Sequence, residues 1–562
     1  MKNHISVLLI LYLISFCLTA QNPVSYRIVK EGSGRKGIVV SAHPLASEAG
    51  IAILQKGGNA VDAAIAVQFA LAVVYPQAGN LGGGGFLVVR FSDGRNLALD
   101  FRETAPAAAT RDMFLDTAGN PVPWLSLKGP LASGVPGTVD GIFASLSFAR
   151  LPLKELIAPA IDLAQKGFRI TDREAVSLNL NRENFLRYNK YPVAFVKDVP
   201  WKEGDILRQP DLARTLEKIR DGGRDSFYSG SVAHAIVHLM KQGGGIITRE
   251  DLKNYRTVER KPDTFSYRGK TVITMPLPSS GSMILRQVLS ILSWYPVRNY
   301  GFASPAAIHL MAEAERRSYA DRARYLGDPD FVPDPSALLN DPVYLKKRME
   351  NFSWEKATPS TLVSYSLADE PTETTHFSVI DADGNAVAVT TTLNGSYGCF
   401  AVVPGMGFLL NNEMDDFSTK PGSPNAYGAL GGKANAIEPG KRMLSSMSPT
   451  IVLSENKPFL ILGSPGGTTI PTTVLQVIVN VIDFGMPLKD AVFAPRFHHQ
   501  WMPDQILMEK GFPQKTLDEL KKKGHHISEA RALGSVNAIM VHADGTFEGV
   551  GDRRGDNSVA FY

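Results

Sequence analysis

The segment "DEPTETTHFSVIDADGNAVAVTTTLNGSYG", from Asp369 to Gly398, decides the fold of the chain. Two runs rich in Val, Ile and Thr, "HFSVI" and "AVAVTTTL", flank the polar letters "DADGN". Asp-Gly between two such runs predicts a buried β-hairpin. A polar stretch that leads into a strand is common, so Thr374 can be a simple strand-start residue. The alternative is that the chain is cut immediately before Thr374.

The chain before this hairpin alternates short strands with apolar helices. "GIVVSAH" predicts an early strand, and a short helix is predicted from Ser47, which caps it, to a stop at Gly57 and Gly58. "NAVDAAIAVQFALAVVYP", residues 59–76, predicts a second helix. Because this segment contains an Asp and a Gln and ends at a Pro, it is typical of a buried core helix rather than a membrane span.

Two more hairpins and a charged helix complete the pattern. "GGGGFLVVRFSDGRNLALDFRETAP" predicts a hairpin with Asp93 and Gly94 at its turn, and "SPTIVLSENKPFLILGSPGG" predicts another. "HLMAEAERRSYADRARYLGDPDF", from His309, predicts a helix with Arg and Glu three to four residues apart. Strands flanked by buried helices indicate an α/β (α+β) protein whose sheets are sandwiched between helical layers.

The composition is that of a globular protein. Of 562 residues, 44% are hydrophobic and 20% are charged, so disorder is not expected and the chain is long enough for several cores. The formal net charge is only +4, and the sequence shows no basic stripe. These values give no support to nucleic-acid binding.

The N-terminus, "MKNHISVLLILYLISFCLTAQ", predicts a secretory signal peptide, residues 1–20, cleaved after Ala20. The alternative is an uncleaved anchor, although the apolar run is shorter than the roughly 20 residues of a spanning helix. A lipoprotein at Cys17 is less favoured because a bulky Phe precedes it. We therefore expect an exported protein, periplasmic or extracellular, in which Cys399 remains alone and forms no intramolecular disulfide.

Isolated motifs leave the chemistry open. "GGGGF" is not a dinucleotide fingerprint, because it precedes a strand instead of opening a helix. "GSPGGTT", from Gly463, could present backbone N–H groups to an oxyanion or form a plain turn. The pairs His498–His499 and His525–His526 seldom supply two ligands to one ion, since neighbouring strand residues point to opposite faces. We therefore expect structural histidines and no metal.

Longer motifs resemble one family across nearly the whole chain. The hairpin is followed in order by "LLNNEMDDFS", "KPGSPNAYG", "KRMLSSMSPTIV", "GSPGGTTIPTTVLQ" and "FAPRFHHQW". Before it come "GGNAVDAAIA", "LDFRETAP", "GVPG" and "MPLPSSG". In this order and at these spacings the motifs resemble γ-glutamyltranspeptidases, which are N-terminal nucleophile hydrolases. The resemblance implies a four-layer αββα sandwich.

The resemblance also implies that the precursor cuts itself between Glu373 and Thr374. A large subunit, residues 21–373, and a small catalytic subunit, residues 374–562, would then stay together in one αββα fold as a heterodimer. The cut is required to activate the Thr374 hydroxyl as a nucleophile. A hydroxyl is a weak nucleophile, and a freed α-amino group can act as its base, whereas an amide nitrogen cannot take the proton.

Site residues carry over from the family by motif. The matches to catalytic residues are Thr374, Thr392, Gly466 and Gly467, of which Thr392 would orient the nucleophile and the glycines would donate to the oxyanion. The matches to residues that bind a γ-glutamyl head group are Arg102, Ser445 and Ser446 for its α-carboxylate, and Glu413 and Asp416 for its α-ammonium. Asn394 would lie within reach of the head group. Taken singly, each has an ordinary alternative, such as a strand threonine or a surface ion pair.

Two positions bear on substrate choice. "KPGSPNAYG" resembles a lid loop over the bound glutamyl group, with Tyr427 as its aromatic stop, although the composition also suits a plain exposed loop. Position 413 is Glu here, whereas bacterial relatives often carry Gln. Both side chains accept from an ammonium, and Glu413 adds a negative charge that should favour a cationic amino group.

The implied reaction is ping-pong γ-glutamyl transfer from glutathione or another γ-glutamyl amide to water, an amino acid or a dipeptide. No metal or organic cofactor is implied, and after signal removal no stable membrane span is expected. Poly-γ-glutamate hydrolases and β-lactam acylases share the fold. The lid disfavours the first, and Glu413 with Asp416 disfavours the second. A catalytically silent exported binding protein is the alternative that is not an enzyme.

Overall fold

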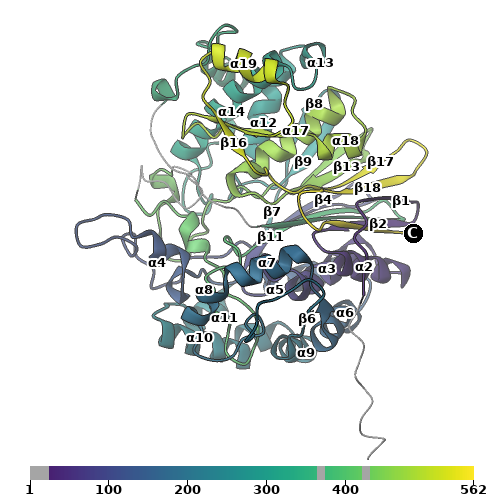
Figure 1. The fold of residues 1–562 in the computed structure, drawn as a ribbon, viewed down its shortest axis with the longest axis vertical. Coiled ribbons are helices and arrows are strands. Elements are labelled where there is room, and N and C mark those ends of the chain that lie inside the picture. The colour runs from purple at the N-terminus through teal and green to yellow at the C-terminus, as the bar shows by residue number, and fades with distance from the viewer. Residues whose placement is uncertain (1–24, 364–373, 421–430) are drawn as a thin grey trace, which may run out of the picture.

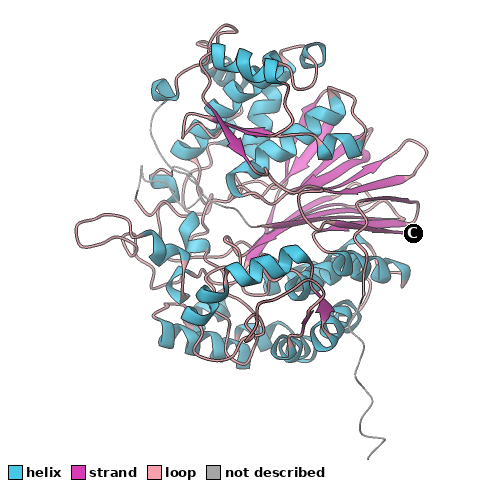
Figure 2. Cartoon of the chain, in the orientation of Figure 1, coloured by secondary structure: helices cyan, strands magenta, loops and turns pink. Residues whose placement is uncertain are grey.

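Two seven-stranded sheets lie face to face at the centre of the chain, and helices cover the outer side of each (Figures 1 and 2). The structure is a computed structural model that describes residues 25–363, 374–420 and 431–562. The four layers run helix, sheet, sheet, helix. The predicted αββα sandwich is therefore confirmed.

The first sheet contains the predicted central hairpin. In spatial order its strands are β19 (Ser558–Phe561), β2 (Gly37–Ser41), β10 (Thr375–Asp381), β11 (Ala386–Thr392), β3 (Gly84–Arg90), β4 (Asn96–Asp100) and β7 (Val258–Arg260), all antiparallel. The turn between β10 and β11 is held by Asp381 Oδ1, which accepts from the N–H groups of Asp383 and Asn385. Gly384 there has φ of 86°, a conformation that suits glycine.

The second sheet contains the later hairpin, β12–β13. Its strands are β1 (Glu31–Gly34), β18 (Phe547–Gly551), β17 (Asn537–Val541), β13 (Lys457–Gly463), β12 (Thr450–Ser454), β9 (Lys270–Thr274) and β8 (Asp263–Tyr267). Two small sheets lie outside the sandwich: β14 (Phe497–His498), β15 (Ile506–Glu509) and β16 (Ile527–Ala530), and β5 (Phe168–Arg169) with β6 (Ile206–Leu207).

Two hydrophobic cores arise because alternate strand residues point to opposite faces. In β2, Val39 packs toward the first helical layer, whereas Ile38 and Val40 pack between the sheets. In β10, Phe377 packs toward the first helical layer and Ile380 packs between the sheets. The central strands are thus buried on both faces, which explains their continuous apolar letters.

The helices divide into two outer layers and peripheral segments. The first layer contains α2 (Pro44–Gln55), α3 (Ala60–Val74), α5 (Thr138–Ser145), α6 (Leu153–Lys166), α9 (Pro210–Tyr228) and α10 (Ser231–Gly243). The second contains α12 (Gly281–Ser293), α14 (Pro305–Tyr325), α17 (Ile470–Ile482), α18 (Leu488–Phe493) and α19 (Gln514–Lys522). The remaining helices are α4 (Pro123–Leu127), α7 (Asp172–Leu180), α8 (Arg182–Tyr188), α11 (Arg249–Asn254), α13 (Val297–Tyr300), α15 (Ser336–Leu339) and α16 (Pro342–Arg348).

The predicted start of the first helix was wrong. α2 begins at Pro44 with His43 as its N-cap, because His43 Nδ1 accepts from the N–H of Leu45 and proline suits the first helical turn. Ser47 instead lies inside the helix, where its Oγ hydrogen-bonds to Ser41 and to the backbone of Ser558. A buried histidine cap carries no strong sequence signal.

The apolar helix predicted over residues 59–76 and the charged helix predicted from His309 are both confirmed. Every residue of α3 is buried, and the carboxylate of Asp62 accepts from the N–H groups of Asn59, Arg150 and Leu151. α14 contains the predicted ion pairs of Glu313 with the arginines three and four residues later, but they are buried. Within the described residues, no helix is both long and apolar enough to cross a membrane.

Candidate active site

Thr374 lies immediately before β10, at the end of the central hairpin. Its Oγ1 donates a hydrogen bond of 3.3 Å to Thr392 Oγ1 on the neighbouring strand. The two side chains meet because the register pairs Thr375 with Thr391. Thr392 Oγ1 also accepts from the N–H of Asn394 at 2.7 Å. The hairpin therefore sets the direction of the Thr374 hydroxyl.

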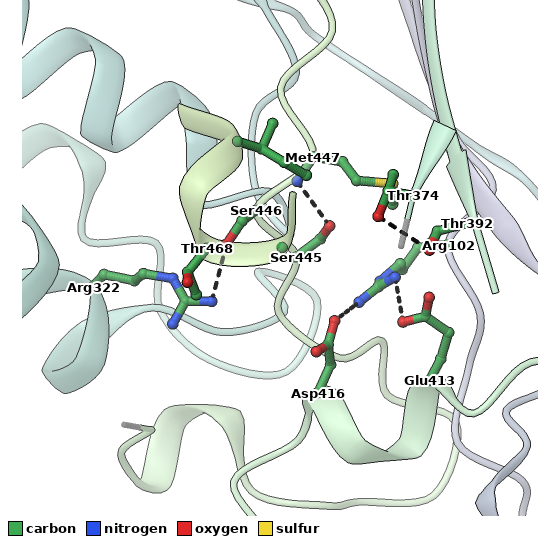
Figure 3. A pocket seen from close by; sticks show the side chains of 12 residues that line it. Arg102, Arg322, Thr374, Thr392, Glu413, Asp416, Ser445, Ser446, Met447 and Thr468 are labelled. Carbon is green, nitrogen blue, oxygen red and sulfur yellow. Dashed lines mark hydrogen bonds and ion pairs between the residues drawn. The ribbon is translucent and has the colours of Figure 1, made fainter. Parts of the chain in front are cut away.

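A pocket of about 320 Å³ opens beside this hydroxyl (Figure 3). Its lining comes from β11 of the first sheet, from the residues next to β4 and β10, from α14, and from three segments of the C-terminal third of the chain. The lining residues are Arg102, Arg322, Thr374, Thr392, Glu413, Asp416, Ser445, Ser446, Met447, Gly467, Thr468 and Ile470. Residues far apart in sequence thus share one concave site, as is typical of a ligand pocket.

Arg102 forms the charged floor of the pocket, just after the end of β4. Its Nη1 lies 2.6 Å from Glu413 Oε2, and its Nη2 donates to Asp416 Oδ2 (Figure 3). Nη1 also lies 3.7 Å from Glu103 Oε2. The Arg102 side chain is buried, as are those of both glutamates. Its N–H donates to Asp100 Oδ1 on the last residue of β4, which fixes the backbone. The Arg102 guanidinium therefore lies among three carboxyl groups.

This crowding shifts the pKa values of all four groups. Although burial opposes its charge, the neighbouring carboxylates raise the pKa of Arg102. Burial raises the pKa of Glu413 well above its usual value, and it also raises the pKa of Asp416 and Glu103, in each case against the pull of Arg102. Burial therefore outweighs the attraction of Arg102 and favours the protonated forms of Glu413 and Asp416.

Ser445 and Ser446 lie on the loop before β12, beside the N-terminus of α12. The loop is fixed by two backbone hydrogen bonds, one of which runs from Ser280 N to Ser445 O at 2.7 Å. Ser445 Oγ accepts from the N–H of Met447 at 3.1 Å, and Ser446 Oγ accepts from Arg322 Nη2 at 3.3 Å. Each hydroxyl keeps its own proton for another acceptor, because a serine oxygen can accept and donate at once.

The glycine pair lies in the turn between β13 and α17. Gly466 has φ of 137° and Gly467 has φ of 53°, a backbone path that favours glycine. Within the described residues, neither N–H donates to a protein acceptor. Thr469 closes the turn, its N–H and Oγ1 both donating to Gly466 O. This geometry goes beyond a plain turn and leaves two donors beside the pocket.

The structure brings most of the predicted site residues together but not all of them. Asn394 and Gly466 contact lining residues without lining the pocket themselves, and the Asn394 side chain donates to Asn412 O at 3.0 Å. Glu373 and Tyr427 lie outside the described residues. Sequence reasoning missed four lining residues, namely Arg322, Met447, Thr468 and Ile470. Of these, Arg322 lies within the helix that the sequence predicted from its Arg and Glu spacing, and no motif singled it out.

The histidine pairs make separate structural contacts. His498 Nδ1 lies 2.8 Å from Thr472 Oγ1, whereas His499 Nδ1 accepts from the N–H of Trp501. Burial lowers the pKa of both rings to about 4. His525 Nε2 is hydrogen-bonded to His309 Nδ1 at 2.7 Å. These two rings lie close to Glu313, within 4.8 Å between ligand atoms, but Arg316 and Arg317 already neutralise that carboxylate.

A solved structure of similar fold defines the class. A cephalosporin acylase from Bacillus halodurans superimposes with a TM-score of 0.84 and 27% identity, covering 96% of this chain and 98% of that one. Four layers with a threonine at the start of a central strand are the fold of the N-terminal nucleophile hydrolases.

Sequence comparison narrows the class to a family. Residues 46–562 match the family described as gamma-glutamyltranspeptidase. The glutathione hydrolase proenzyme of Escherichia coli strain K12 is 48% identical over 541 residues, which is 95% of this chain and 93% of that protein. The gamma-glutamyltranspeptidase structure of Helicobacter pylori is 46% identical, with a TM-score of 0.57 over 61% of this chain and 97% of its own. The chain belongs to the gamma-glutamyltranspeptidase family.

Proposed function

We propose that this protein transfers γ-glutamyl groups from glutathione and γ-glutamyl amides to water, amino acids or dipeptides. The observation that carries the proposal is the shared pocket, in which the Thr374 hydroxyl lies beside a buried guanidinium and its carboxyl partners. A nucleophile is thereby placed beside groups that suit an amino-acid head. Similarity to a glutathione hydrolase proenzyme supports the same activity.

The active form arises by cleavage between Glu373 and Thr374. The Thr374 hydroxyl attacks the carbonyl carbon of Glu373, the C–N bond breaks, and an ester forms while the nitrogen takes a proton. Water then opens the ester and restores the hydroxyl. The product carries a free α-amino group on Thr374, with an ordinary pKa of roughly 7.7–8.0, which can take the proton of its own hydroxyl.

The two proposed subunits cannot separate easily, because they share both sheets. β10 and β11, from residues 374–562, pair with β2 and β3, from residues 21–373. We propose that they stay together as a heterodimer. Residues 1–20, which lie outside the described part of the chain, are proposed as an export signal that delivers the protein to the periplasm or the extracellular space.

The charge pattern of the pocket complements a γ-glutamyl head group. The α-carboxylate would meet Arg102 and the two serine hydroxyls, and the α-ammonium would meet Glu413 and Asp416, with Asn394 close by. Because Arg102 is already paired with these carboxylates, the zwitterion adds one charge of each sign to an existing pair. The bound zwitterion itself carries no net charge.

Catalysis then runs in two half-reactions. Thr374 Oγ1 attacks the γ-carbonyl carbon, its proton passes to the α-amino group, and the tetrahedral oxyanion is stabilised by the N–H groups of Gly466 and Gly467. The amine of the donor leaves with that proton, and a γ-glutamyl ester remains on Thr374. Water or an acceptor amine attacks the ester and releases glutamate or a new γ-glutamyl amide.

Steady-state kinetics with a γ-glutamyl p-nitroanilide donor and a dipeptide acceptor test this proposal. A ping-pong scheme predicts parallel double-reciprocal lines as acceptor concentration varies, and p-nitroaniline release without acceptor reports hydrolysis. Intersecting lines would show that donor and acceptor react in one ternary complex. No release with the mature two-fragment protein would refute the proposed function.

The pH dependence of donor binding follows from the raised carboxyl pKa values. In the empty site Glu413 and Asp416 hold their protons above the usual carboxyl range, and a bound ammonium favours their ionised forms. Binding therefore releases protons, so the donor KM should fall as pH rises from about 5 to 8. Glu413→Gln removes one titrating group, which should flatten this slope and raise KM about 3–10-fold while cleavage of the chain continues.

A glutaryl p-nitroanilide, which lacks the ammonium, is the matched control for this prediction. Its KM should not fall over the same pH range, because no cation replaces the released protons. An identical pH slope for the wild-type protein and Glu413→Gln would show that Glu413 does not contact the head group. Constant ionic strength is needed, since salt screens these interactions.

Substitution of Gly466 tests the proposed oxyanion turn. A Cβ there would lie 2.4 Å from Thr469 Oγ1, and φ of 137° is strained for any other residue. Gly466→Ala should therefore lower kcat by about 100-fold or more and leave the donor KM within about threefold. Gly485→Ala, at an exposed positive-φ turn with open space around its Cα, is the matched control. A rise in the donor KM with an unchanged kcat would contradict an oxyanion role.

A second candidate activity is acylation by substrates without an ammonium, as the cephalosporin acylase likeness suggests. Glu413 and Asp416 oppose it, because two carboxyl groups facing an uncharged acyl chain would remain buried without a cationic ligand. Competition between glutaryl and γ-glutamyl anilides distinguishes the two activities. A higher kcat/KM for the glutaryl donor would favour the acylase.

A further inference from the structure

α14 contributes two side chains to the pocket region from outside the C-terminal part of the chain. Tyr319 and Arg322 are three residues apart, so they lie on the same face of the helix. Both are buried, and neither belongs to an ion pair within 4.0 Å in the described chain. Tyr319 reaches the turn after Gly466 and Gly467. Arg322 reaches the loop of Ser445 and Ser446, the serine loop.

Arg322 supports the serine loop through two hydrogen bonds. Its Nε donates to Ser280 Oγ at 3.0 Å. Its Nη2 donates to Ser446 Oγ at 3.3 Å (Figure 3). Ser280 Oγ in turn donates to Ser445 O at 2.8 Å. Since a guanidinium can only donate, Arg322 occupies a lone pair of Ser446 Oγ. Ser446 Oγ also lies 3.4 Å from Ser280 Oγ, whose own proton goes to Ser445 O. The Ser446 proton can turn from this long contact to an anionic ligand in the pocket.

Tyr319 supports the turn that contains Gly466 and Gly467, the proposed oxyanion turn. Its hydroxyl donates to the backbone oxygen of Thr468, the residue that follows the glycine pair. Thr468 is held from the other side by its own Oγ1, which donates to Gln500 Oε1 at 2.5 Å. A peptide plane fixed at its oxygen and at the neighbouring side chain cannot rotate freely. Thr468 is thereby held at its backbone oxygen and its side chain, and it anchors the end of the turn that carries the Gly467 N–H.

We propose that Arg322 and Tyr319 are positioning residues. Arg322 would affect substrate binding, and Tyr319 would affect catalysis. Arg322 aims the Ser446 hydroxyl at the α-carboxylate of the donor, and Tyr319 holds the turn that presents the oxyanion donors. This inference rests on the proposed γ-glutamyl transfer. Because Arg322 and Tyr319 belong to residues 21–373, whereas Ser446 and Thr468 belong to residues 374–562, the large subunit would tune a site whose nucleophile belongs to the small one.

The two roles predict opposite kinetic effects. Arg322→Gln should raise the KM of a γ-glutamyl anilide about tenfold with kcat within about threefold, because it affects a contact made in the ground state. Tyr319→Phe should lower kcat about tenfold with KM within about twofold, since oxyanion donors act in the transition state. The matched controls on α14 are Arg324→Gln and Tyr325→Phe, which lie outside the pocket lining and should leave both parameters unchanged.

A donor without the α-carboxylate, 4-aminobutanoyl p-nitroanilide, separates orientation from a general loss of structure. Arg322→Gln should not raise its KM, whereas a merely structural defect would affect both donors. Combined with Ser446→Ala, Arg322→Gln should add no further loss, because Arg322 would act through Ser446. An additive loss, or an equal loss for both donors, would overturn the inference.

A denaturing gel of each variant shows whether the chain is cleaved and hence folded around Thr374. If Arg322→Gln stays uncleaved, Arg322→Lys keeps the charge and one donor, and it should mature with a smaller rise in KM. Failure of both variants to mature would assign Arg322 to assembly instead and overturn the proposal. A wild-type protein without γ-glutamyl transfer would refute the proposed function, whereas an active wild type with unaffected variants would refute this inference alone.

Discussion

Replacing Thr374 by Ala is expected to abolish both cleavage of the chain and γ-glutamyl transfer. Without Oγ1 there is no nucleophile for the Glu373 carbonyl, so the α-amino base is never released. Activity should fall by at least about 10⁴-fold. A denaturing gel should show one band at the 61.0 kDa of the full chain or slightly below it after signal removal, instead of two smaller bands.

Thr375→Val is the matched control for this substitution. Thr375 is the next residue, and its Oγ1 is buried without a hydrogen-bond partner in the described structure. Valine keeps the shape and removes an unsatisfied polar group, so this variant should mature and remain active. Thr374→Ser keeps a hydroxyl and should mature more slowly. Cleavage that survives in Thr374→Ala would remove Thr374 from the role of nucleophile.

Replacing Arg102 by Gln is expected to have the second largest effect. The donor carboxylate loses its buried guanidinium, which should raise KM about 100-fold or more for a γ-glutamyl anilide. The fold should also lose about 3–5 kcal/mol, because Glu413 and Asp416 would remain buried without their cation. Michaelis kinetics and thermal unfolding measure the two effects separately. Arg95→Gln, at an exposed ion pair, should change neither.

A double variant separates binding from stability. In Arg102→Gln/Glu413→Gln one of the unpaired carboxyl groups is also removed, so part of the lost thermal stability should return. The donor KM should remain high, because the carboxylate site is still missing. Recovery of affinity together with stability would show that Arg102 supports the fold and does not bind the donor.

Much of the fold could be predicted because its signals are local. The hairpin β10–β11 follows from "DADGN" between two β-rich runs, and α3 follows from its length and apolar letters. The start of α2 could not be predicted, because its cap is a histidine whose role depends on tertiary burial. The four-layer order came from family resemblance, since no local pattern states which face of a strand meets the other sheet.

Site residues could be predicted from the sequence only where they belong to a motif that resembles the family. Thr392 and Ser446 have ordinary meanings in isolation, and the pocket shows them beside Thr374 only after the chain folds. Arg322 was missed for a physical reason. An arginine on a charged helix usually faces water, but α14 is buried almost all round, and its polar groups are satisfied by loops from distant parts of the sequence.

The central claim is that Thr374 becomes a new N-terminus and carries the γ-glutamyl group. Mass spectrometry of the small fragment after an acid quench with a γ-glutamyl anilide tests both parts at once. The predicted result is a fragment that begins at Thr374 and ends at Tyr562, with one γ-glutamyl group attached to Thr374. A fragment that begins at another residue, or a glutamyl group attached elsewhere, would contradict the account.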